Sequence, residues 1–265
     1  FWALYAYYLA SPFNFLVMFV PQTHIIEFMT ALIVIKIGLS GFTFAWYLNR
    51  HFGEKGGHPS YGVTCFGVLY ALSGYMAAYS WNIMWLDCLI LIPLIIWGLE
   101  LLVKEGRCAI YCICLGLSIL SNYYLSIMIC IFVVIYFIML IVNSSPEDQM
   151  AGKKLVLTFG RFALYSLLAG GFAGAILLPE FHALQMTKFS EVSWPSAMKA
   201  YFSTIDVLSR HFINVDVEIG LDHWPNLYCG VGILFLFPLY IMNDEISWKE
   251  KTIKLSVAVV MLISY

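Results

Sequence analysis

The longest apolar run of the chain covers residues 109–142, and none of its side chains carries a charge. A helix that crosses the ~30 Å hydrocarbon core of a membrane needs about 20 apolar residues, whereas a barrel strand needs about 10 residues of alternating polarity. The run does not alternate in this way, and it is too long for one span. Because the polar string Ser121-Asn122-Tyr123-Tyr124 interrupts it, we expect two short or broken helices that bend at this string.

Composition extends this conclusion to the whole chain. Hydrophobic residues make up 62% of the sequence and charged residues only 11%. A soluble domain carries about 25% charged residues, so the sequence predicts an all-α, polytopic helical membrane protein with about 7–8 spans. The formal net charge of −2 gives no indication of a nucleic-acid partner. The seven cysteines match no zinc-ligand spacing, so we interpret them as packing residues and predict no metal site from them.

Hydropathy divides the rest of the chain into spans and polar segments. Residues 1–21 are aromatic and broken by Ser11-Pro12, so we predict an interfacial segment there. Residues 180–227 are polar and are predicted to form an extracytoplasmic loop. We expect residues 1–265 to form a single transmembrane domain, a fragment of a longer protein with both ends missing. Further spans are predicted at 25–48, 61–80, 88–103, 161–179 and 228–242, before an apolar run that continues to the last residue.

The basic residues predict the orientation of these spans. The cytoplasmic side of a membrane protein carries an excess of Lys and Arg. If residues 109–142 cross the membrane twice, 10 of the 14 basic residues fall on one side, whereas a single crossing puts Lys153-Lys154 outside. The run Trp81–Asp87 and the loop at 180–227 then lie on the extracytoplasmic side. The ten residues are Arg50, Lys55, Lys104, Arg107, Lys153, Lys154, Arg161, Lys249, Lys251 and Lys254.

Acidic, amide and aromatic side chains gather on this predicted outer side. Aromatic rings stack on the apolar faces of sugars, and carboxylates accept hydroxyl protons or hold a divalent cation. We therefore interpret these side chains as candidates for binding a sugar or a lipid phosphate, with either Arg210 or Lys188 as the residue that could meet the phosphate. Besides Arg210, the candidates are Asn82, Trp85, Asp87, Asn122, Tyr123, Tyr124, Asn226 and Tyr228.

Structural roles remain open for several of these residues. Trp85 suits an aromatic belt at the membrane interface. Asp87 could cap the start of the span that follows it, and Asn122-Tyr123-Tyr124 could satisfy free backbone groups at a helix break. On the same side, Glu180 is interpreted as a solvated residue at the end of a span.

Lys36 lies in the middle of the predicted span at 25–48, within an otherwise apolar run. A charged side chain at this depth needs a partner or a water-filled cavity, and the distance is long for a side chain that reaches to the interface. We therefore expect an ion-paired or functional lysine. Its candidate partners are Asp87 and an acid outside this chain.

Six strings along the chain form a pattern that covers nearly its whole length. The most specific are Trp81-Asn82-Ile83-Met84-Trp85-Leu86-Asp87 and Ser121-Asn122-Tyr123-Tyr124. The others are Tyr7-Tyr8-Leu9-Ala10-Ser11-Pro12-Phe13-Asn14, Lys36-Ile37-Gly38-Leu39-Ser40-Gly41, Tyr70-Ala71-Leu72-Ser73-Gly74-Tyr75 and Pro225-Asn226-Leu227-Tyr228-Cys229-Gly230. Taken together and in this order, they resemble the YfhO family of bacterial membrane proteins.

The resemblance implies a GT-C-like helical bundle in the bacterial plasma membrane. Such a glycosyltransferase takes a sugar from a polyprenyl-phosphate carrier and passes it to a cell-envelope polymer, such as a teichoic acid, on the outer face. The catalytic base is expected upstream of Phe1, so no catalytic residue is assigned here, and the need for a divalent cation stays open. The alternative is a non-enzymatic transporter or lipid flippase, which would also use Lys36 and a broken helix pair.

Overall fold

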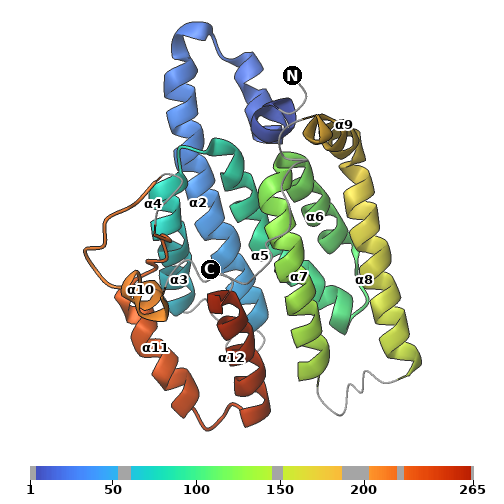
Figure 1. Ribbon diagram of the computed structural model, residues 1–265, viewed down its shortest axis with the longest axis vertical. Helices are drawn as coiled ribbons and strands as arrows, with labels where there is room; N and C mark the ends of the chain where they lie inside the picture. The colour runs from blue at the N-terminus through green and yellow to red at the C-terminus, as the bar shows by residue number, and fades with distance from the viewer. Residues whose placement is uncertain (1–3, 53–60, 145–151, 187–202, 220–223, 264–265) are drawn as a thin grey trace.

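All regular secondary structure in the described part of the chain is helical. The computed structural model describes residues 4–52, 61–144, 152–186, 203–219 and 224–263, which Figure 1 shows as a bundle of helices. Three short π- or 3-10-helical segments come first: η1 (Tyr5–Leu9), η2 (Pro12–Phe19) and η3 (Gln22–His24). The α-helices are α2 (Ile25–Phe52), α3 (Tyr61–Ala71), α4 (Gly74–Tyr79), α5 (Ile83–Lys104), α6 (Ala109–Ser121), α7 (Tyr123–Asn143), α8 (Lys153–Phe172), α9 (Gly174–Gln185), α10 (Thr204–Ser209), α11 (Val231–Met242) and α12 (Trp248–Ile263).

Several of these helices are suited to a membrane by length and composition. In the described ranges, 5 helical stretches are long and apolar enough to cross it, and α6 and α11 are shorter apolar helices. These elements confirm the predicted all-α, polytopic fold. The 5 long stretches are Gln22–Phe52, Tyr61–Tyr79, Ile83–Lys104, Tyr123–Asn143 and Lys153–Phe172.

The longest apolar run bends where the sequence predicts. α6 ends at Ser121 and α7 begins at Tyr123. The two helices then lie side by side in opposite directions (Figure 1), with the hydroxyl oxygens of Ser118 and Ser126 2.9 Å apart across the break. The start of α6 and the end of α7 therefore lie at the same end of the bundle, as the positive-inside argument requires.

The two ends of the bundle differ in charge. We call the end at the α6–α7 break the Asn122 end, and the opposite end the basic end (Figure 1). The basic end holds the last turns of α2, α5 and α7 and the first turns of α8 and α12. Arg50, Lys104, Lys153 and Lys249 all lie in these turns, whereas Lys55 lies outside the described residues. By the positive-inside rule, we expect the basic end to face the cytoplasm.

Helix boundaries differ from the prediction at several points. α5 begins at Ile83, five residues before the predicted start at residue 88. α8 begins at Lys153, where the sequence predicts a loop, and α9 continues beyond residue 180, the predicted start of the long loop. The start of α8 was missed because Lys153 and Lys154 were assigned to a loop. Long cationic side chains at a helix end can keep their stems on apolar surface while their charged groups reach water.

α5 lies at the centre of the bundle, packed between α2 and α6. Its side chains Ile95, Leu99 and Leu102 are fully buried. Gly98 lets α6 approach closely, because a Cβ atom at this position would lie 2.5 Å from the backbone nitrogen of Tyr111. Because these helices cover α5, a polar side chain that is buried on it must find its partner inside the protein.

Candidate functional site

A buried ion pair joins α2 to α5 near the Asn122 end. Lys36 Nζ lies 2.9 and 3.0 Å from the two carboxylate oxygens of Asp87, and the side chains are only 0% and 2% exposed. Nζ also donates to the carbonyl oxygen of Ile83 at 3.0 Å. An unpaired charge is expensive to bury, so each side chain stabilises the other in the apolar bundle. Of the two candidate partners of Lys36, the structure selects Asp87.

The predicted interfacial segment closes over this pair. Ser11 is fully buried, and its hydroxyl oxygen lies 3.4 Å from Lys36 Nζ. The ring centroid of Phe13 lies 5.4 Å from the same nitrogen, in reach of a cation–π interaction. Neither residue is predicted from the sequence as a site residue. The signal that could have found them is the Ser11-Pro12 break inside one of the family-like strings.

The capping interpretation of Asp87 is wrong. α5 begins at Ile83 with Asn82 at its N-cap position, so Asp87 lies beyond the first free backbone N–H groups. Asn82 is itself buried, at 6% exposure, but its side chain makes no capping hydrogen bond. The partner of the Asp87 carboxylate is therefore Lys36, and not the helix terminus.

Aromatic rings form a layer at the same end of the bundle. Trp85 packs against Tyr79 and Tyr124, with ring centroids 5.4 and 6.3 Å away. Tyr7 lies 6.2 Å from Tyr123 and 6.3 Å from Tyr124. We call these five residues the aromatic layer. Rings of an interfacial belt need not touch one another, whereas a contiguous layer offers a surface on which a ring-shaped or unsaturated ligand can stack.

Asn122 holds the helix break together. Its side-chain oxygen accepts a hydrogen bond from the Leu125 backbone nitrogen at 2.9 Å, which caps α7. Its side-chain nitrogen donates to the carbonyl oxygen of Tyr7 at 3.2 Å, and the whole residue is buried. The structural interpretation of Asn122 is thus confirmed. The same side chain also fixes Tyr7 in the aromatic layer.

Glu180 is buried, so its interpretation as a solvated residue is wrong. It is 2% exposed on α9 and lies beside the Tyr123 hydroxyl. Neither carboxylate oxygen meets a donor in hydrogen-bond geometry within the described ranges. The residue borders an apolar cavity of about 390 Å³ together with Ile127 and Phe181. A second carboxylate, besides Asp87, is therefore buried near the Asn122 end.

Arg210 organises the segment that follows α10. Its guanidinium group donates to the carbonyl oxygens of Asp216 at 2.8 Å and Pro225 at 3.1 Å. It also contacts the side chains of Asn226 at 3.2 Å and Glu218 at 3.4 Å. The arginine is 8% exposed. Because these donors are already engaged inside the protein, Arg210 is placed to hold this segment in shape.

The same segment docks on α4. The carbonyl oxygen of Tyr228 accepts a hydrogen bond from the Gly74 nitrogen at 2.6 Å. Asn226 lies beside Tyr79, a member of the aromatic layer. The structure thus brings the predicted residue Asn226 next to one ring of the aromatic layer. Residues 187–202 and 220–223 of the predicted loop lie outside the described residues.

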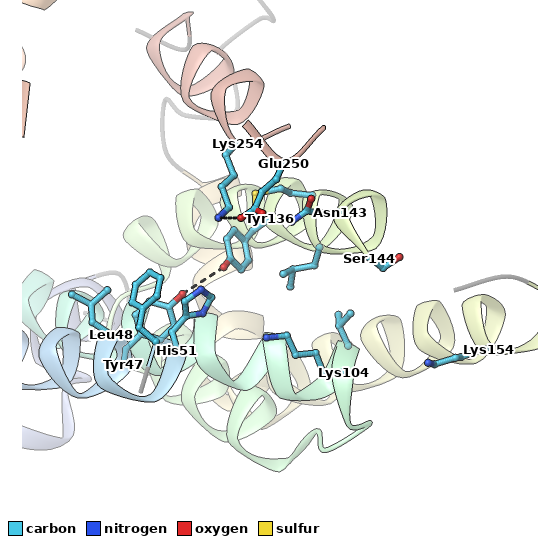
Figure 2. A pocket seen from close by; sticks show the side chains of 14 residues that line it. Tyr47, Leu48, His51, Lys104, Tyr136, Asn143, Ser144, Lys154, Glu250 and Lys254 are labelled. Carbon is cyan, nitrogen blue, oxygen red and sulfur yellow. Dashed lines mark hydrogen bonds and ion pairs between the residues drawn. The ribbon is translucent and has the colours of Figure 1, made fainter. Parts of the chain in front are cut away.

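A further buried carboxylate lies on α5 towards the basic end, and the sequence did not predict it as a site. Glu100 is 3% exposed, and one of its oxygens accepts hydrogen bonds from the hydroxyls of Tyr47 and Tyr136, both at 2.8 Å. Its other oxygen lies 2.8 Å from His51 Nδ1. Figure 2 shows Tyr47, His51 and Tyr136 side by side. A usable signal was the spacing of Tyr47 and His51, which puts both on one helix face.

The Asn122 end combines a neutralised charge pair, amide groups and aromatic surface. Among the residues that the structure describes, no three His, Cys, Asp or Glu side chains converge to form a metal site. Asp87 is engaged by Lys36, which makes it a poor acceptor for a substrate proton. The chemistry that this arrangement supports is binding and positioning: stacking on rings and hydrogen bonding to buried polar groups.

Comparison with known proteins gives one family match. The sequence model of the family described as "Bacterial membrane protein YfhO" matches residues 1–265. No curated protein and no solved structure matches the chain.

Proposed function

Because this chain belongs to the YfhO family of bacterial membrane proteins, we propose that it is a GT-C-type membrane glycosyltransferase. The donor is a sugar on a polyprenyl-phosphate carrier, and the acceptor is a teichoic-acid-like or other cell-envelope polymer on the outer face. One observation carries the proposal: the aromatic layer lies beside the buried Lys36–Asp87 pair, at the end opposite the basic end. Since the basic end is cytoplasmic by the positive-inside rule, the aromatic layer belongs to the outer side.

The proposed reaction is a displacement at the anomeric carbon of the sugar. The acceptor hydroxyl loses its proton to a general base while its oxygen bonds to that carbon. The bond from the carbon to the phosphate oxygen breaks, and polyprenyl phosphate leaves with the negative charge, which a cationic group stabilises. We do not assign the role of general base to Asp87, because Lys36 engages its carboxylate.

The residues of this chain act in the proposal by positioning the substrate. Trp85, Tyr123 and Tyr124 form the stacking surface for the sugar or the first isoprene units. Lys36 and Asp87 fix α2 against α5 beneath this surface, and Ser11 ties the preceding segment to them. A second set of residues also acts by positioning. Arg210, Asn226 and Tyr228 hold the segment after α10 against α4, at the edge of the aromatic layer.

The test is the composition of the cell envelope in a deletion strain. We expect the deletion to remove one sugar from a purified envelope polymer, as measured by hydrolysis and chromatography. Wild-type protein should restore the sugar, whereas Trp85→Ala should restore about one tenth of it, the effect of losing one stacking contact of ~1.4 kcal/mol. The matched control is Trp81→Ala, because Trp81 is 59% exposed and lies outside the aromatic layer.

Protein levels in the membrane must be equal for this comparison. Asp87→Asn joins the series as a probe of the ion pair, with lower transfer expected. Unchanged glycosylation in the deletion strain would remove the glycosyltransferase proposal.

A transporter or lipid flippase is the second candidate function. The buried Lys36–Asp87 pair and the helix break at Asn122 favour it, because transporters use intramembrane charges and interrupted helices. The two functions differ in the intermediate that accumulates on deletion. Loss of a transferase leaves the lipid-linked sugar on the outer leaflet, whereas loss of a flippase leaves it on the inner leaflet.

A further inference from the structure

A cavity of about 550 Å³ lies at the basic end of the bundle. Figure 2 shows its lining side chains reaching in from different helices. His51 comes from α2, Lys104 from α5, Lys154 from α8 and Lys254 from α12. The volume is in the range of about 300–1,000 Å³ that is typical of small-molecule sites.

One wall of the cavity is fixed by the buried Glu100 carboxylate. It bonds to His51 Nδ1 at 2.8 Å, which orients the imidazole ring and leaves Nε2 as the ring atom free for a ligand. Its other oxygen accepts from Tyr47 and Tyr136. The carboxylate is therefore satisfied by the protein, and His51, at 25% exposure, presents the outer edge of the network to the cavity.

The charges around the cavity have a positive sum. Three lysines and two glutamates give +1 when His51 is neutral and +2 when it is protonated. One lysine, Lys104, is 63% exposed, and its Nζ lies 3.8 Å from the nearer Glu100 oxygen, so it keeps room for another partner. Asn143 and Ser144 add neutral polar groups to the lining. The lysines are Lys104, Lys154 and Lys254, and the glutamates are Glu100 and Glu250.

We infer that this cavity binds a phosphate group, carried either by an anionic phospholipid of the cytoplasmic leaflet or by a soluble phosphate ester. Basic pockets between transmembrane helices on the cytoplasmic side are suited to anionic headgroups. Lys254 pairs with Glu250 at 2.5 Å, so Lys104 and Lys154 supply the point charges for the phosphate, and His51 and Asn143 supply hydrogen bonds.

This site is independent of the proposed transferase. It lies at the opposite end of the bundle from the aromatic layer, and it shares none of its lining residues with that layer. Ligand binding here would join α2, α5, α8 and α12, which lie in separate parts of the chain. We expect the bound ligand to stabilise their packing at the basic end.

The experiment measures binding to the purified full-length protein in neutral detergent. Phosphatidylglycerol and phosphatidylcholine are titrated separately, with thermal unfolding and native mass spectrometry as readouts. Glycerol 3-phosphate, without acyl chains, tests the soluble source. We expect phosphatidylglycerol to raise the unfolding temperature more than phosphatidylcholine does. The Kd should rise about fivefold for Lys154→Gln and about 25-fold for the double variant Lys104→Gln/Lys154→Gln.

The matched control is Lys153→Gln. Lys153 and Lys154 are adjacent at the start of α8, but only Lys154 lines the cavity. Selective loss of binding in Lys154→Gln, with either the phospholipid or glycerol 3-phosphate as the ligand, supports the site and identifies the source. Equal loss of binding in Lys153→Gln and Lys154→Gln indicates attraction to surface charge alone and overturns the proposed site. Equal binding of the two phospholipids, with no binding of glycerol 3-phosphate, also overturns it.

Discussion

Helix α5 carries two buried carboxylates, and the protein neutralises them in different ways. Asp87 and Glu100 are 2% and 3% exposed, about 20 Å apart along the helix, and both contact α2. Asp87 pairs with one fully buried ammonium group, whereas Glu100 shares its charge among two tyrosine hydroxyls, His51 and the more distant Lys104. If Lys36, the single buried partner, is removed, the Asp87 carboxylate is left buried without a compensating charge. A distributed network loses only one hydrogen bond at a time.

Lys36→Met should have the largest effect on stability. Asp87 would be left buried without a cation, which should lower the free energy of unfolding by about 3–5 kcal/mol. Denaturation of the purified protein in detergent measures the loss. Lys36→Met combined with Asp87→Leu is the control, because removing both charges should restore most of the stability. Wild-type folding and activity in Lys36→Met alone would contradict the role of the ion pair.

Glu100→Gln should have a smaller effect. The amide oxygen can still accept from Tyr47 and Tyr136, whereas the charge that faces His51 is lost. We expect a loss of about 1–3 kcal/mol in unfolding free energy, measured in the same denaturation experiment. A loss as large as that of Lys36→Met would show that the two carboxylates depend equally on the charge of their partners.

Tyr47→Phe removes one hydroxyl from the same network and should cost about 0.5–1.5 kcal/mol. Tyr136 continues to donate to the same Glu100 oxygen, so the carboxylate stays satisfied. Tyr136→Phe is the matched variant and should give a similar value. The double variant should cost more than the sum of the two, because only then does that oxygen lose both hydroxyl donors.

Lys104→Gln is expected to change stability least. Its ammonium group lies 3.8 Å from Glu100, and the side chain is 63% exposed, so water screens the interaction. An exposed pair at this helical spacing contributes about 0.3–0.5 kcal/mol. Unfolding in low and high salt measures this term. A loss above that of Tyr47→Phe would show that Lys104 belongs to the buried network.

The buried sites were predictable to different degrees. Lys36 could be found because a lysine in the middle of an apolar span needs a partner, and Asp87 was one of two candidates. Glu100 was not found, because it lies one turn before a cluster of charged residues and looks like part of the helix end. Glu180 was misinterpreted because it falls at the predicted end of a span. Sequence shows that a residue is close to a span end, but not whether a neighbouring helix covers it there.

Hydropathy, the break at Asn122 and the distribution of basic residues were enough to establish a helical membrane protein with a bend in its longest apolar run. These features are local, since they depend on span length and on the free energy of placing charge in lipid. Which carboxylate meets which donor was decided by the tertiary structure. Lys36 and Asp87, Ser11 and Lys36, and Tyr47 and Glu100 become neighbours only when α2 packs against α5 and the first segment folds over them. Contacts of this kind depend on helix rotation and depth, which side-chain packing between helices fixes.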